Sequence, residues 1–267
     1  MIDAAPSALP PMIDTHCHLD DRQFAHDIDA VLAASVAANV NRWLLIGYDP
    51  RRWDEAITFV GSHRGMYLTL GVHPAEAPLW NADVEMQLRN LLQESGAVAI
   101  GEAGLDFYRD NAPYEVQAPA FRGQLRLAAE LDVPLIIHMR DAEDELLDIL
   151  AVEPTLPSLV FHSFDGTEKL MDFVLSSGSY VGVGGLATRQ KSDGLRMQLA
   201  RVPLDRMLLE TDSPYLVPAR QKDRRNQPKH VVTIATMMAE YFDTTPDALA
   251  TQTTANAERL FGLNHDH

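Results

Sequence analysis

Short runs rich in Val, Ile and Leu recur along the chain, without a clean alternation of polar and apolar positions. Runs of this kind are typical of parallel strands that are buried on both faces. The pattern predicts eight strands, at residues 12–16, 42–49, 66–74, 97–106, 133–141, 158–164, 180–187 and 206–215.

The segments between these runs carry apolar residues at three- and four-residue spacing, which is the period of a helix with one buried face. The predicted helices lie at 26–40, 115–132, 142–152, 167–177 and 190–201, with two more near 229–242 and 246–260. Eight strand–helix units in a chain of 267 residues predict an α/β protein of the (β/α)₈ barrel type, formed as a single domain over residues 12–264.

An open doubly wound sheet is the alternative arrangement of alternating strands and helices. Such a sheet normally carries a glycine-rich phosphate-binding turn after its first strand, whereas this chain has His16 and His18 there. Residues 1–11 contain neither the basic region nor the apolar region of a secretory signal, so we expect a short flexible lead.

Composition narrows the classes of function. The single cysteine excludes an internal disulfide framework and favours the cytoplasm, and no apolar run approaches the ~20 residues of a membrane span. The net charge of −16 argues against a dedicated nucleic-acid-binding scaffold, because such a surface repels phosphates at long range. An enzyme that holds phosphates locally stays possible. We expect no membrane partner and no obligatory protein partner.

Residues that bind metals follow the apolar runs. Because a strand alternates its faces, His16 and His18 point the same way, about 6.6 Å apart along the chain, while Cys17 points away and is expected to pack. Alone, this pair is as consistent with chance as with a metal site. Five later runs also end in such residues, namely His73, Glu102, His138, His162, and Glu210 with Asp212. In a barrel, all these strand ends surround one pocket.

Four histidines and two carboxylates are too many ligands for one tetrahedral ion and suit two ions that share a carboxylate. The expected ligands are His16, His18 and Asp212 for one ion, His138 and His162 for the other, and Glu102 as the bridge. Two such ions lower the pKa of a shared water and deliver it as hydroxide, while Asp212 accepts the proton. The identity of the two divalent ions stays open among Mg, Mn and Zn.

Three further polar residues have more than one interpretation. His73 precedes Pro74 and either fixes a loop or contacts the substrate, where it would donate a proton to the leaving oxygen. Glu210 shares the face of Asp212, so we expect it to orient a metal-bound histidine or to help hold a third ion. Asp14 shares the face of His16 and is expected to have a similar orienting role.

The motifs IDTHCHLD, GVHP, GEAGLDFYRD, PLIIHMRDA, FHSFDG, GVGG, LLETDSPYL and RRNQP lie between residue 12 and about residue 260. Together they resemble the TatD-type metal-dependent deoxyribonucleases of the amidohydrolase superfamily. The resemblance implies a distorted barrel and the same metal ligands, His16, His18, Glu102, His138, His162 and Asp212. It also implies hydrolysis of DNA, typically from the 3′ end. Ala103 departs from the family's usual Ile or Thr, but its side chain should point out of the barrel and affect packing only.

A basic segment at 219–230 follows the last predicted strand and therefore lies on the face of the metal ligands. Its cations are Arg220, Lys222, Arg224, Arg225 and Lys229. A solvated loop is the alternative for such a run. We expect Arg224 and Arg225 to bind substrate phosphate, joined by Arg140 and Arg189. Phe107, Tyr108 and Tyr215 are candidate stacking surfaces for unpaired bases.

The resemblance therefore implies a metal-dependent 3′–5′ exonuclease acting on short or single-stranded DNA ends, and we expect Asp212, Glu102 and His73 to be its catalytic residues. The alternative is an amidohydrolase that cleaves a C–N or acyl bond, in a cyclic amide or an aminoacyl-tRNA type of substrate. The basic segment favours the phosphate ester, because a neutral amide needs no such grip.

Overall fold

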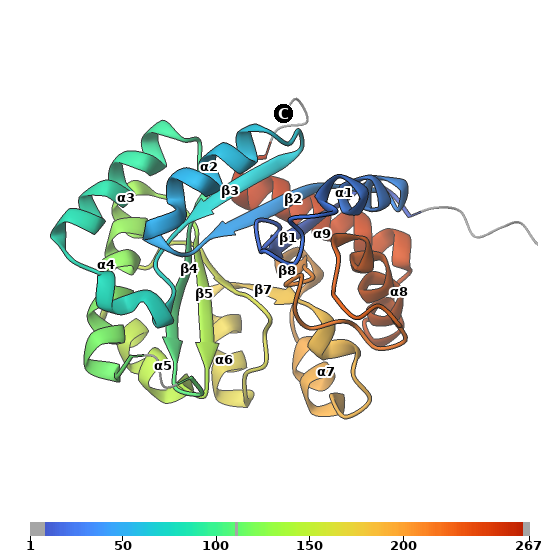
Figure 1. Cartoon of the computed structure of the whole chain (residues 1–267). Coiled ribbons are helices and arrows are strands. Elements are labelled where there is room, and N and C mark those ends of the chain that lie inside the picture. The colour runs from blue at the N-terminus through green and yellow to red at the C-terminus, as the bar shows by residue number, and fades with distance from the viewer. Residues whose placement is uncertain (1–8, 110–111, 264–267) are drawn as a thin grey trace, which may run out of the picture.

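The structure, a computed structural model, describes residues 9–109 and 112–263. Eight parallel strands form one sheet in the sequential order β1 to β8, which confirms the predicted (β/α)₈ barrel (Figure 1). The strands are β1 (Met12–Cys17), β2 (Val40–Gly47), β3 (Met66–Leu70), β4 (Ala99–Asp106), β5 (Leu135–Arg140), β6 (Leu159–Phe161), β7 (Tyr180–Val183) and β8 (Met207–Leu209).

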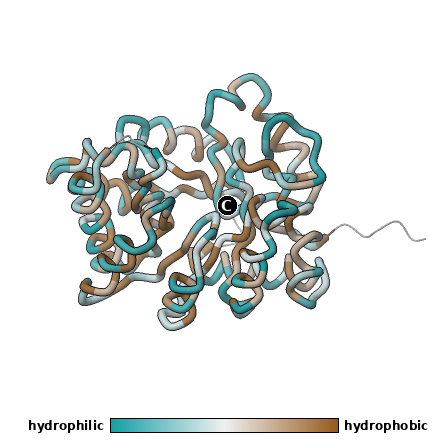
Figure 2. The backbone as a smooth tube through the Cα atoms, turned by 90° about the horizontal axis from the view of Figure 1, so that it is seen from below, coloured by the Kyte–Doolittle hydropathy of each residue, from teal (hydrophilic) through white to brown (hydrophobic). Residues whose placement is uncertain are grey.

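The helices surround the strands as an outer ring, and hydrophobic and hydrophilic positions are mixed along their turns (Figure 2). They are α1 (Ile28–Ala37), α2 (Trp53–Gly61), α3 (Ala82–Glu94), α4 (Tyr114–Leu131), α5 (Glu143–Val152), α6 (Glu168–Ser177), α7 (Asp193–Leu199), α8 (Val231–Tyr241) and α9 (Pro246–Phe261). Short 3₁₀ turns are η1 (Pro50–Arg52), η2 (Pro74–Leu79), η3 (Gly185–Thr188), η4 (Leu204–Arg206) and η5 (Pro228–His230). None of these described helices is long and apolar enough to cross a membrane.

All the predicted helices form, and α2 and α3 are additional. A signal for α3 was present in the sequence. The Asn81 side chain accepts hydrogen bonds from the N–H groups of Asp83 and Val84, which is a helix N-cap, and Leu88 and Leu92 lie four residues apart on the buried face.

Four strands end three or more residues before their predicted ends. β3 ends at Leu70, β6 at Phe161, β7 at Val183 and β8 at Leu209, and η3 replaces most of the predicted end of β7. Pro74, which cannot donate to a strand ladder, begins η2. His73 and Asp212 consequently lie on loops beyond their strands, where the backbone is free to turn their side chains inward.

The interior of the barrel is apolar at one end and polar at the other. The apolar end is filled by Ile13, Leu44, Ile46, Tyr67, Ala99, Ile136, Val160, Tyr180 and Leu208, and closed by Ala257, Phe261 and Leu263 in and after α9. Because side chains alternate along a strand, residues two positions further on face the same interior. These are His138 after Ile136, His162 after Val160 and Glu210 after Leu208.

A second and larger apolar layer fills the space between the sheet and the helices. Cys17 and Ala103 are both fully buried in this layer. Their side chains therefore pack outside the barrel interior, as the alternation of each strand predicts. The Cys17 thiol also donates a hydrogen bond to the carbonyl of Leu44.

The barrel closes between β1 and the segment after β8. Cys17 and Ser213 form a single parallel bridge there, and the N–H of His18 donates to the carbonyl of Ser213 (2.8 Å). The N–H of Asp212 donates to the carbonyl of His16 (2.9 Å). Three metal-ligand candidates, His16 and His18 after β1 and Asp212 after β8, therefore share one seam of the barrel.

The predicted lead at 1–11 falls mostly outside the described residues. Within its described part, the carbonyl of Leu9 accepts a hydrogen bond from the Asn39 side chain (2.8 Å), and the carbonyl of Pro11 accepts one from Thr254 (3.2 Å). The chain is therefore already held against the domain before β1 begins.

Candidate metal centre

Glu102, in the middle of β4, lies at the centre of a cluster of imidazole rings. Its Oε1 lies 2.5 Å from His138 Nδ1, 2.7 Å from His162 Nε2 and 3.9 Å from His73 Nε2. Its Oε2 lies 3.5 Å from His16 Nε2 and 4.0 Å from His18 Nε2. The structure thus brings together imidazoles from four different strand ends around one carboxylate.

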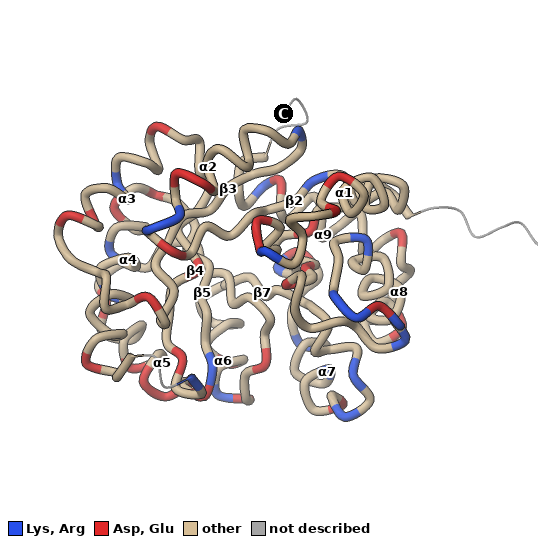
Figure 3. Tube along the Cα trace, viewed as in Figure 1, with Lys and Arg blue, Asp and Glu red and all other residues tan. Residues whose placement is uncertain are grey.

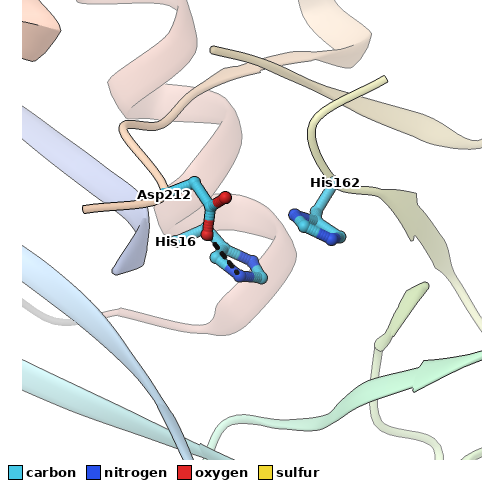
Figure 4. A group of neighbouring side chains, drawn as sticks. All are labelled: His16, His162 and Asp212. Atoms are coloured by element: carbon cyan, nitrogen blue, oxygen red, sulfur yellow. Dashed lines mark ion pairs between the residues drawn. The ribbon is translucent and has the colours of Figure 1, made fainter. Parts of the chain in front are cut away.

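Asp212 completes the cluster on the side of β1. Its Oδ1 lies 3.3 Å from His18 Nε2 and 3.7 Å from His16 Nε2. His16 also stacks on His162, with ring centres 4.0 Å apart and an angle of 11° between the planes. Figure 4 shows His16 and Asp212 together on one side of the interior, with His162 facing them from β6. All six predicted ligands therefore converge on one site.

The ring nitrogens of this cluster fit a metal site. Both nitrogens of His16, Nδ1 of His18 and Nδ1 of His162 are buried without a hydrogen-bond partner among the described residues. A buried polar atom without a partner is costly, so these nitrogens call for a ligand. The groups with mutually close donor atoms are His16–His162–Asp212, His16–His18–Glu102 and His73–Glu102–His138.

The electrostatics of the cluster favour a cation. Burial by itself raises the pKa of Glu102, but the facing rings of His162 and His138 outweigh it and hold that pKa well below its usual value. Burial also opposes a charge on His162, yet Glu102 raises the pKa of that imidazole well above its usual value. The carboxylates thus attract positive charge to the centre, and a divalent ion supplies it more directly than protons.

His73 presents an N–H to the cluster. Its Nδ1 accepts a hydrogen bond from the N–H of Ala75 (3.0 Å), which caps η2. Burial, with a smaller effect from His138, lowers the pKa of His73 to about 3, so the ring is neutral and carries its proton on Nε2. The loop-fixing interpretation of His73 is therefore supported at Nδ1, while its Nε2–H can donate a hydrogen bond to a ligand. Transfer of a proton to the leaving oxygen does not agree with a pKa of about 3, because the ring then carries no proton to give up near neutral pH.

Asp106, the last residue of β4, is a site residue that the sequence pattern did not identify. Its Oδ2 lies 3.0 Å from His138 Nε2, which leaves Nδ1 as the nitrogen of that ring facing Glu102. Burial raises the pKa of Asp106, but the hydrogen bond with His138 and the N–H of Arg109 outweigh it and lower the pKa to about 2. Alternation was the available signal, since Asp106 and Glu102 share one face of β4.

Thr211, between Glu210 and Asp212, is held by hydrogen bonds at three atoms. Asp14 accepts from its backbone N–H (2.8 Å) and from its hydroxyl (2.5 Å). The Asn226 amide donates to its carbonyl (2.7 Å). Asp212 itself has φ of 57°, a left-handed conformation that is uncommon for residues other than glycine. The hydrogen bonds of Thr211 hold the backbone that leads into this turn.

Asn226 belongs to the RRNQP motif. It is buried and holds this part of the basic segment to the interior of the protein. Its backbone N–H donates to the carbonyl of Pro214 (3.0 Å), and its Oδ1 lies 2.8 Å from Nδ1 of the buried His230. His230 Nε2 in turn lies 2.7 Å from Asp223. The motif therefore connects the surface of the loop to Thr211.

Glu210 lies against β7 and beside His162. A Cβ at Gly182 would lie only 2.0 Å from Glu210 Oε2, so this approach requires glycine in the GVGG motif. Glu210 Oε1 accepts a hydrogen bond from the N–H of Ser163 and lies 3.7 Å from His162 Nδ1. Glu210 thus lies beside His162 without a hydrogen bond to it, and its orienting role stays a prediction.

The cations of segment 219–230 differ in their contacts, and they lie in the loop beside α8 (Figure 3). Arg225 donates two hydrogen bonds to Asp27 (2.7 and 3.1 Å) and covers the ring of Phe24 at 4.3 Å. Arg224 is exposed and makes no ion pair with any carboxylate of the described residues. Arg220 and Lys222 are also exposed. The structure thus leaves Arg224 available to a ligand and engages Arg225 in holding the loop to the start of α1.

Aromatic side chains surround the mouth. Tyr215 is partly exposed, its ring meets that of His18 at 5.8 Å, and its hydroxyl lies 3.3 Å from Asp21. Arg140 lies under the ring of Tyr108, and the Phe107 ring meets the Tyr114 ring at 6.0 Å. Arg189 is exposed.

The sequence profile of a family described as TatD related DNase matches residues 13–262. A protein named 3′-5′ ssDNA/RNA exonuclease TatD, from Cronobacter sakazakii, is 39% identical over 261 residues, covering 95% of this chain and 98% of that protein. A protein named uncharacterized metal-dependent hydrolase YabD, from Bacillus subtilis, is 32% identical and covers 95% of this chain and 100% of that protein. The crystal structure of the TatD homolog YjjV from Escherichia coli superposes with a TM-score of 0.87 at 28% identity, covering 95% and 98% of the two chains.

Proposed function

Because the chain belongs to the TatD related DNase family, we propose that it is a metal-dependent hydrolase that removes nucleotides from the 3′ ends of single-stranded DNA or RNA. The observation that carries this proposal is the convergence of buried imidazoles on Glu102 and Asp212 at the mouth of the barrel, where several ring nitrogens have no hydrogen-bond partner among the described residues. A metal-assisted hydrolysis needs such a site.

The centre is proposed to hold two divalent ions, with Glu102 as the shared ligand. His16, His18 and Asp212 would hold one ion, and His138 and His162 the other. Bound divalent ions polarise a phosphoryl oxygen and lower the pKa of a water molecule. The four imidazoles suit Zn or Mn, and the two carboxylates also admit Mg.

The chain's own residues have separate tasks in this proposal. Asp212 accepts the proton of the attacking water, for which its low pKa in the folded chain, set by His18 against the effect of burial, keeps it ionised. His73 directs its Nε2–H at the phosphate or the leaving oxygen. Arg224 lies on an exposed loop at the mouth and contributes positive charge to a substrate phosphate.

An assay with metal-reconstituted protein tests the proposed function. The substrates are single strands of DNA and RNA labelled at the 5′ end, the matching duplex, single strands blocked at the 3′ end, and a panel of cyclic and acylated amides. We expect a ladder that shortens from the 3′ end of the free single strands and no cleavage of the blocked ones. Hydrolysis of an amide without cleavage of any nucleic acid would favour the amidohydrolase instead.

The number of metal ions is tested separately by titrating Mn²⁺ or Zn²⁺ into metal-free protein. Two equivalents per chain are expected at saturation. Saturation at one equivalent would contradict the two-ion site, even if the nuclease activity is confirmed.

A further inference from the structure

Tyr108 and Arg140 form a stacked pair at the mouth of the barrel. The guanidinium carbon of Arg140 lies 3.6 Å from the centre of the Tyr108 ring, so it covers one face of that ring. Tyr108 is nevertheless 63% exposed, which makes it one of the most exposed large aromatic residues of the described chain. An aromatic ring with one supported face and one open face is a surface for stacking a planar ligand.

The pair is placed by the same strands that place the metal ligands. Arg140 is two residues beyond His138 on β5, so both side chains lie on one face of the strand, about 6.6 Å apart along it. Arg140 is also the register partner of Asp106 on β4. A ligand that is bound at the metal centre and is longer than this distance can therefore also contact the Tyr108–Arg140 pair.

Asp106 connects the backbone of Tyr108 to the metal-ligand candidate His138. Its Oδ2 lies 3.0 Å from His138 Nε2, while its Oδ1 accepts hydrogen bonds from the backbone N–H groups of Tyr108 (3.0 Å) and Arg109 (2.9 Å). One carboxylate thus fixes a metal-ligand candidate and the turn that carries the exposed ring. A loose surface tyrosine would have no such connection.

The charge of Arg140 is also available. Its guanidinium makes no ion pair with the carboxylates of the described residues, whereas Arg51, Arg52, Arg89 and Arg225 all do. In a chain with a net charge of −16, an unpaired cation beside the site is a local exception. It adds attraction for an anionic ligand and strengthens stacking on the ring above it.

Resting on the proposed function, we propose that the open face of Tyr108 binds a nucleobase of the substrate, in the nucleotide at the cleaved bond or next to it. Arg140 supports the ring from below. A base inside a duplex already has both faces stacked on its neighbours, so only an unpaired base can use this surface. The Tyr108–Arg140 pair is therefore a selector for single strands and is indifferent to base identity, because every base has an aromatic face.

The test compares a short single-stranded oligonucleotide with one of the same length whose three 3′-terminal residues are abasic. The two carry the same phosphates and differ in the bases that can stack. We expect Tyr108→Ala to raise KM for the normal oligonucleotide about 5- to 100-fold and to leave the abasic one within about twofold. Tyr108→Phe, which keeps the ring, should stay within about twofold on both. The metal content of each variant should equal that of the wild type.

Tyr241→Ala is a matched control, because Tyr241 is 47% exposed and lies under the guanidinium of Arg196 at 4.5 Å, at the C-terminal end of α8. It should change neither KM. Equal effects of Tyr108→Ala on both oligonucleotides, or none on either, overturn the stacking surface and leave the nuclease function standing. If the wild type neither binds nor cleaves either oligonucleotide, the proposed function and the stacking surface are both overturned.

Discussion

The two sides of the metal centre are held in different ways. On the side of β4 and β5, His138 lies between the carboxylates of Glu102 and Asp106, which come from the adjacent strand. On the side of β1 and β8, Asp212 depends on Thr211, whose hydrogen bonds reach Asp14. The first arrangement is charged and local, and the second is a buried network between residues 197 positions apart.

This difference follows from where the barrel closes. β4 and β5 pair regularly from Ala103 to Asp106, after an irregularity that contains Glu102, so the ladder fixes the position of Asp106 relative to His138. β1 and the segment after β8 share a single bridge, at Cys17 and Ser213. The hydrogen bonds of Thr211 with Asp14 therefore add to the few backbone hydrogen bonds that close the barrel, and they also hold the backbone before Asp212. Changes at the β1–β8 seam should affect folding and metal binding together, whereas changes at β4–β5 should affect the site alone.

The largest effect is expected from Asp212→Asn, which keeps the shape of the seam and removes the proton acceptor. Turnover should fall by about 10²- to 10⁴-fold, because an amide cannot take a proton from water. The metal content should fall less than in a His16→Ala/His18→Ala double variant, measured by elemental analysis. Turnover within about threefold of the wild type would remove Asp212 from the mechanism.

Asp106→Asn probes the β4–β5 side. The amide keeps an oxygen for the N–H groups of Tyr108 and Arg109 but loses the charge that faces His138. Affinity for Mn²⁺ or Zn²⁺ should fall about 10- to 100-fold, while the thermal midpoint of the metal-free protein stays within a few degrees. A large drop in that midpoint would show that this side is structural as well, and the contrast between the two sides would be lost.

Thr211→Val probes the seam with nearly the same side-chain volume. Loss of the hydroxyl leaves one oxygen of the buried Asp14 without its donor, so the free energy of unfolding should fall by about 1–3 kcal/mol. Metal affinity should fall with it, and Thr211→Ser should restore both. Thr253→Val is the control, because the buried Thr253 hydroxyl donates only within α9. It should lower stability and leave metal affinity unchanged. If Thr211→Val lost stability but kept its metal affinity, the seam would stabilise the fold without positioning the metal ligands, and the prediction would be wrong.

The smallest effects on activity and stability are expected from substitutions in the basic segment 219–230, which connects the β1–β8 seam to the protein surface through Asn226. Arg224→Ala should weaken substrate binding and reduce the slope of log affinity against log salt by about 0.7, the value for one phosphate contact on a single strand. Arg225→Ala should mainly lower the thermal midpoint, because Arg225 holds the segment to Asp27 and Phe24. If instead Arg225→Ala reduced the salt dependence and Arg224→Ala did not, Arg225 would have to leave Asp27 when substrate binds.

The sequence by itself determined which side chains face the mouth of the barrel. Eight apolar runs with intervening helices allow few closed arrangements, and in a barrel all strand ends meet at one place. His16, Glu102, His138 and His162 could therefore be assigned to one site before any distance was known. The same alternation placed Cys17 and Ala103 on the outer face of their strands, where they are found.

Only the tertiary structure decided which partner each of these side chains has. Strand length was overestimated at β3, β6, β7 and β8, because the pattern along one segment does not show where the ladder with its neighbour ends. The pairing of Asp14 with Thr211 and the engagement of Arg225 by Asp27 join residues 197 and 198 positions apart. Periodicity gives the direction of a side chain from its neighbours in sequence, but a hydrogen bond depends on the position of an atom from elsewhere in the chain. That position exists only once the barrel has closed.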